Sequence, residues 1–141
     1  MKLEIVKSHR MKTFIIDLAF FLISIVAGVI FGVLLSSLLG IPTGRFSMSI
    51  VSIICVFSSI AIVSYFRFML NSENIITRVF LLAVVVLIFC SIIVFYYSGA
   101  SLVDSFFWNW MITLILLFVL PIFIGSTLAI FHQKLNYSNR L

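Results

Sequence analysis

FIIDLAFFLISIVAGVIFGVLLSSLL, residues 14–39, is a run of 26 residues with one ionisable side chain, Asp17. At about 1.5 Å per residue, a helix of this length exceeds the roughly 30 Å of a bilayer's hydrocarbon core. Three more apolar runs follow, at residues 47–70, 75–97 and 105–131. The chain is 64% hydrophobic and 9% charged, against about 45–50% and 25% in soluble domains. The sequence therefore predicts an all-α integral membrane protein with four transmembrane helices in one domain, residues 1–141.

The first run follows a basic leader and is too long for a signal-peptide core. Such cores contain about 7–15 apolar residues before a cleavage site with small residues. This run continues to Ser36-Ser37-Leu38-Leu39-Gly40, where no alanine pair marks a cleavage site. We therefore expect the first run to remain a membrane span.

The chain has a net charge of +5, and its basic residues lie at the ends of the spans, where such residues determine membrane topology. One side of the membrane carries only Arg45, and the other carries Lys2, Lys7, Arg10, Lys12, Arg67, Arg78, Lys134 and Arg140. This bias predicts a multi-pass protein of the cell membrane with both termini cytoplasmic, and no nucleic-acid partner. The short links favour an up-down-up-down bundle.

Small residues recur at every fourth position of the first span. They are Ser24, Gly28, Gly32, Ser36 and Gly40, and we call them the span-one ridge. Helices in lipid associate through close packing at such residues. The spacing is compatible with packing against another span of the same chain and with contact to a second protein.

The second span is rich in hydroxyl groups, and Ser52, Cys55 and Ser59 share one of its faces. One interpretation is a polar track for an ion or small solute. The other is that the serines pack closely and bond to their own helix carbonyls. The two cysteines, Cys55 and Cys90, both fall inside spans, where we expect free thiols.

Three charged side chains lie at matching depths below one membrane surface. Asp17, Arg67 and Arg78 are each about one helical turn, roughly 6–8 Å, inside their spans. Pairing of Asp17 with Arg67 or Arg78 would neutralise charge and fix the register of three spans. Alternatively, the arginines extend to the headgroups and Asp17 lies near water. A proton-carrying role for Asp17 is less favoured than either.

The polar residues do not form a pattern typical of an enzyme. Little of the chain lies outside the spans, and no catalytic, cofactor or metal-binding spacing occurs. We therefore expect no catalysis, no cofactor and no metal. Pro121 interrupts the fourth span and predicts a kink. Small multidrug transporters also have four spans, but they carry an acidic residue deep in the first helix, where this chain has Ala27-Gly28.

The sequence thus favours a small non-enzymatic membrane protein that acts through helix–helix contacts, as an accessory subunit, regulator or immunity-type protein of a membrane complex. Its expected partners are membrane lipid and another membrane protein or a second copy. The alternative is a small oligomeric transporter, flippase-like or channel- or holin-like protein, in which Asp17 and the serines of span two line a path.

Overall fold

The computed structural model describes residues 2–41, 50–98 and 105–138, and all regular structure in these ranges is helical. The elements are α1 (Lys2–Leu38), α2 (Ile50–Leu70), α3 (Ile75–Ser98), α4 (Ser105–Leu114), the π-helical turn η1 (Ile115–Val119) and α5 (Leu120–Ser138). Four helices, with α4, η1 and α5 forming one of them, are long and apolar enough to span a membrane. The predicted all-helical class with four apolar spans is therefore confirmed.

Two helices extend past the spans predicted from hydropathy. α1 begins at Lys2 and includes the basic leader, and α5 continues past residue 131 to Ser138. Neither extension contains proline or glycine, so nothing local ends the helix where the apolar run ends. The predicted start of the second span, residues 47–49, lies outside the described residues.

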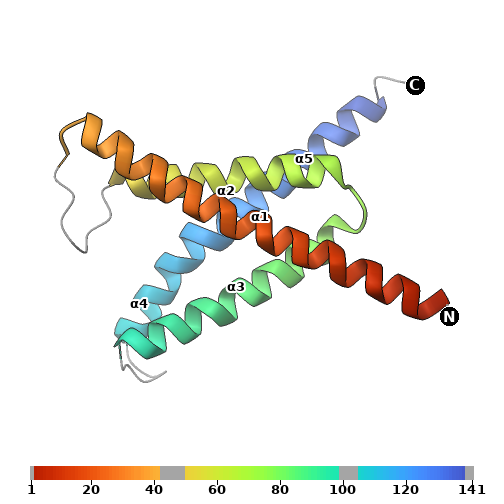
Figure 1. Cartoon of the computed structure of the whole chain (residues 1–141), viewed down its shortest axis with the longest axis horizontal. Coiled ribbons are helices and arrows are strands. Elements are labelled where there is room, and N and C mark those ends of the chain that lie inside the picture. Colours follow the sequence, from red (N-terminus) through yellow and green to blue (C-terminus); the bar gives the residue numbers. More distant parts are fainter. Residues whose placement is uncertain (1, 42–49, 99–104, 139–141) are drawn as a thin grey trace.

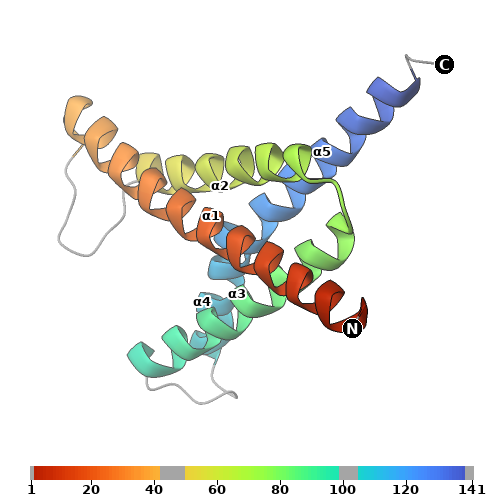
Figure 2. The ribbon, with the colours of Figure 1, turned by 45° about the vertical axis from the view of Figure 1, so that its right-hand side comes forward.

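The helices alternate in direction and cross one another. In Figure 1, α1 and α3 run from right to left, and α2 and the α4–α5 helix return from left to right. The start of α1, residues 71–74 and the end of α5 lie at one end of the molecule in Figures 1 and 2. We call this the basic end, because its segments contain Lys2, Lys7, Arg10, Lys12, Arg67, Arg78 and Lys134.

The crossing helices splay apart instead of forming the compact bundle that the short links favour. α2 packs chiefly against α1 and α5, whereas α3 packs mainly against α4 and η1. Away from the crossings, the α1–α2 pair and the α3–α4 pair diverge, as Figures 1 and 2 show. Short links set the order of the helices, but contacts between small residues set where they cross.

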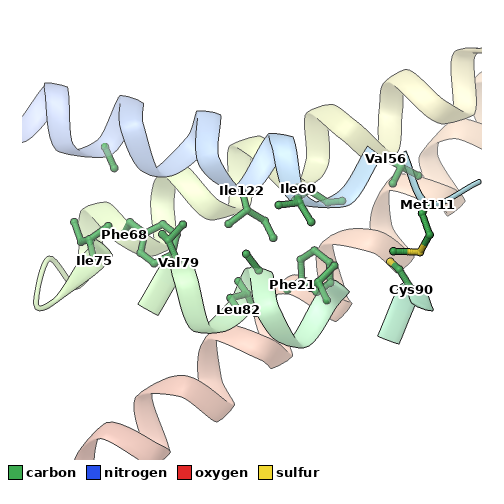
Figure 3. Close-up of a cluster of buried hydrophobic side chains, with 14 of the residues drawn as sticks. Phe21, Val56, Ile60, Phe68, Ile75, Val79, Leu82, Cys90, Met111 and Ile122 are labelled. Carbon is green, nitrogen blue, oxygen red and sulfur yellow. The ribbon is translucent and has the colours of Figure 1, made fainter. Parts of the chain in front are cut away.

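The buried apolar core lies where the helices cross. Ile60 and Phe68 of α2 and Ile122 of α5 are almost completely buried, and Phe21 of α1 and Leu82 of α3 complete the same cluster (Figure 3). Side chains of α1, α2, α3 and α5 therefore meet in one buried core.

The irregularity expected at Pro121 takes the form of a π-helical turn just before it. The amide of Leu120 donates to the carbonyl of Ile115, five residues back. Pro121 is buried and has no amide hydrogen for the carbonyl of Leu117. The longer turn absorbs this change within a helix that continues to Ser138.

Candidate functional site

Asp17, Arg67 and Arg78 meet at the basic end and join α1, α2 and α3. The Oδ1 atom of Asp17 accepts from Nε of Arg67 at 2.8 Å and from Nη2 of Arg78 at 2.6 Å. Its Oδ2 atom accepts from Nε of Arg78 at 2.7 Å. We call these three residues the ion cluster. Of the arrangements that the sequence left open, the structure has Asp17 paired with both arginines.

The two arginines of the ion cluster differ in how completely they are bonded. Nη1 of Arg78 also donates to the carbonyls of Asn71, at 2.7 Å, and Glu73, at 3.3 Å. Arg78 thus ties the α2–α3 turn to α1. Within the described residues, Arg67 donates only through Nε, and its guanidinium lies 5.5 Å from the ring centre of Phe20.

The cluster has one negative and two positive groups, so its formal charge is +1. The side chain of Asp17 is 2% exposed, that of Arg78 8% and that of Arg67 14%. A buried neutral pair of Asp17 and Arg78 is therefore bordered by a second guanidinium with spare donors. This arrangement fixes the register of three helices and, among the residues that the structure describes, leaves one positive charge without a paired carboxylate.

The span-one ridge packs against α2 of the same chain. A Cβ atom at Gly28 would lie 2.7 Å from Cα of Val56, and one at Gly32 would lie 2.6 Å from Cα of Ser52. Real Cβ atoms do not approach so closely, so only glycine fits at these two crossing points. Of the two kinds of contact that the spacing allowed, the structure has the intramolecular one at these glycines.

The rest of the ridge divides into two parts. Ser24 and Ser36 are buried, and the carbonyl of Ser24 accepts from the hydroxyl of Ser59 on α2 at 2.8 Å. Gly40 does not take part in this packing, because no described atom lies within 4 Å of its Cβ position. It has φ of 66° and ends α1, since the amide of Ile41 returns to the carbonyl of Ser36.

The candidate polar track of α2 is used in the same helix contact. Ser52 is buried opposite Gly32, and Ser59 donates to α1. Cys55 is half-buried, and its backbone carbonyl lies beside Gly28. The structure brings the three residues together with the ridge, so the two faces singled out in the sequence form one α1–α2 seam.

Sequence reasoning missed the contacts between α2 and α5. The hydroxyl of Tyr65 lies 2.9 Å from Nδ1 of His132, and Nε2 of Gln133 donates to the carbonyl of Phe68 at 3.2 Å. Seven residues before His132, Gly125 lies so close to α2 that a Cβ atom there would be 2.8 Å from Cβ of Ser64. The signal present in the sequence is Gly125, four residues after Pro121.

No three side chains of the metal-binding types His, Cys, Asp and Glu gather anywhere within residues 2–41, 50–98 and 105–138. No family model, curated protein or solved structure matches the chain.

Proposed function

We propose that the protein is a non-enzymatic component of a membrane complex that acts through helix–helix contacts, as an accessory subunit, a regulator or an immunity-type protein. Its charged and hydroxyl side chains at the ion cluster and the α1–α2 seam are engaged in holding helices together. What the chain offers to other molecules is therefore mainly apolar helix surface.

The observation on which this proposal depends is the large area of that surface. The accessible area of the chain is 10309 Å², whereas a compact monomer of 16.0 kDa exposes about 7,400 Å². The excess, about 2,900 Å², is summed over the whole chain, including the residues outside the described ranges, and is larger than the roughly 800 Å² that each partner buries in an interface of standard size. Helices from another chain would restore ordinary packing around the splayed pairs.

The outer face of α3 is a suitable surface for such a partner. Phe80, Phe89, Phe95 and Tyr96 of α3 are each at least 60% exposed, with Phe80 and Phe89 on opposite edges of the side that faces away from the core. Large aromatic side chains supply much contact area in interfaces. The span-one ridge is a poorer candidate, because α2 already covers Gly28 and Gly32.

Photo-crosslinking from this face tests the proposal. A photoreactive amino acid at Phe89 is expected to give one discrete polypeptide adduct in native membranes, from a second copy or from another protein. The same residue at Ile122, which is 0% exposed, serves as the control and should react only within the chain. If Phe89, Phe80 and Phe95 all give lipid adducts alone, the proposal fails.

We also propose that both termini are cytoplasmic in the cell membrane. The support is the gathering of basic residues at one end of the molecule, which is typical of the cytoplasmic side. Cysteine labelling tests this topology. Cys55 and Cys90 are first replaced by alanine, and a single cysteine is then introduced at Thr43 or at Ser72. Ser72 should react only after the membrane is made permeable, and Thr43 should react in intact cells. The reverse pattern would refute the orientation.

The alternative of a small transporter, flippase-like or channel-like protein receives less support from the same contacts. It relies on Asp17 and the α2 serines as a path, but Asp17 is held by two arginines, and Ser52 and Ser59 lie in the α1–α2 seam. Solute flux through reconstituted protein that Asp17→Asn abolishes would favour this alternative over the contact function.

A further inference from the structure

We propose that the outer side of the α1–α2 seam binds one phospholipid with an anionic headgroup, whose phosphate is held by Arg67. The proposal relies on membrane placement of the four helices and is independent of any protein partner. It assigns a ligand to two adjoining features, an apolar groove and the spare donors of Arg67.

The groove follows the α1–α2 seam and has a volume of about 730 Å³. Small-molecule sites usually measure roughly 300–1,000 Å³, so the groove is large enough for an extended ligand. Ala27, Gly28 and Phe31 of α1 and Cys55, Ser59 and Val63 of α2 are among the residues that line it. Because most of the lining atoms are apolar, the groove suits an acyl chain.

Arg67 lies beyond the same end of the groove as Val63. Val63 lines both the groove and the small crevice beside Asp17 and Arg67. The guanidinium of Arg67 leans over Phe20, which shares a helical face with Ala27, two turns further along α1. A ligand extending along this face from Ala27 past Phe20 reaches Arg67.

The length of the groove matches one leaflet of a bilayer. Val63 and Ile54, a lining residue further along α2, are four and thirteen residues from Arg67, or about 6 and 20 Å along the helix axis. Half of the hydrocarbon core measures about 15 Å. The groove is thus about 14 Å long, close to one leaflet, and a phosphate drawn down to Arg67, about one turn below the surface, would direct its acyl chain along the groove toward and past the bilayer centre.

Charge favours a lipid over an apolar helix as the occupant. The ion cluster has a formal charge of +1, and Arg67 donates only through Nε within the described ranges. A guanidinium has five N–H donors, so four remain for the two oxygens of a phosphodiester. An apolar helix would fill the groove but would leave this charge unbalanced, whereas an anionic phospholipid satisfies both features.

Native mass spectrometry of the purified full chain tests the site. The probes are the anionic dioleoylphosphatidylglycerol, the zwitterionic dioleoylphosphatidylcholine, which has no net charge, and inorganic phosphate as the free anion. We expect one phosphatidylglycerol per chain to bind more tightly than phosphatidylcholine. Arg67→Gln should weaken phosphatidylglycerol binding about fivefold, with little effect on phosphatidylcholine. Because this variant leaves the Asp17–Arg78 pair neutral, it should still fold.

A second variant tests the groove without touching the ion cluster. Ala27→Phe fills the groove and should weaken binding of both lipids. Thr127→Phe on the exposed side of α5 is its size-matched control, and Lys134→Gln is the charge-matched control for Arg67→Gln. Both controls should leave lipid binding unchanged.

Several results would overturn the proposal. Equal binding of the two lipids, or unchanged binding in both Arg67→Gln and Ala27→Phe, would remove the assigned site. Displacement of phosphatidylglycerol by inorganic phosphate at equal concentration would assign the donors to a free anion. A polypeptide crosslinked from Ala27 in place of lipid would show that a protein occupies the groove. None of these results bears on crosslinking from Phe89, so the two proposals fail separately.

Discussion

Replacing Asp17 by asparagine should destabilise the protein more than removing either arginine that contacts it. Asparagine keeps the shape of the side chain but removes its charge. The formal charge of the ion cluster then rises from +1 to +2, and two guanidinium groups face each other without a carboxylate between them. The amide nitrogen that replaces one oxygen cannot accept the bonds that Arg67 and Arg78 donate.

Asp17→Asn should lower the free energy of unfolding by about 3 kcal/mol, at the lower end of the roughly 3–5 kcal/mol for breaking a buried ion pair. The lower end applies because Arg67 is 14% exposed and can reach the membrane surface. Arg67→Gln should cost only about 1 kcal/mol, because a neutral Asp17–Arg78 pair remains. Arg78→Gln should fall between them, at about 2 kcal/mol, because it also frees the carbonyls of Asn71 and Glu73.

Reversible unfolding in mixed micelles measures these losses. Dodecylmaltoside solutions are titrated with dodecyl sulfate, and helix content is followed by circular dichroism. The fluorescence of Trp108 and Trp110, which belong to α4 at the opposite end from the cluster, provides a second probe. The charge argument is wrong if Asp17→Asn unfolds at the same fraction of dodecyl sulfate as the parent protein. It is also wrong if Arg67→Gln loses as much stability as Asp17→Asn.

Six further substitutions, at five positions, test the helix contacts in the same titration. Gly28→Ala and Gly32→Ala should each lose about 1–3 kcal/mol, because the added methyl group meets the backbone of α2. Gly40→Asn should lose under about 0.5 kcal/mol of stability, because asparagine tolerates the left-handed conformation that ends α1. Gly32→Asn should lose at least as much stability as Gly32→Ala. Tyr65→Phe should lose about 0.6 kcal/mol of stability, a typical value for an interhelical hydrogen bond. If Tyr65 and His132 bond each other, adding His132→Phe to this variant should cause no further loss.

The sequence predicted the class of the fold because apolar composition and run length are local properties. It also placed Asp17, Arg67 and Arg78 at one depth, since depth follows from counting residues along each span. It could not choose between pairing and separate solvation of these groups, because that choice depends on how the helices rotate about their axes. Rotation is set by packing over the whole seam, where Gly28 and Gly32 meet α2.

Other features do not follow from spacing along the chain. Tyr65 and His132 are separated by 67 positions, and no spacing rule connects them. Gly40 continued the four-residue period of the ridge, but its position at the end of the helix gives it a capping role instead. The splayed arrangement was missed because short links restrict only which helices are neighbours and leave their crossing angles free.

In the proposed complex, protein helices cover the surface that this chain leaves exposed. A lipid-retaining polymer can extract the protein from native membranes that contain the chain at its natural level. The mass of the extracted particle then shows whether other protein helices are bound to the chain. We expect a protein mass well above the 16.0 kDa of one chain, reduced toward that value when Phe80, Phe89 and Phe95 are replaced by serine. A particle that contains a single 16.0 kDa chain and lipid alone would contradict the account.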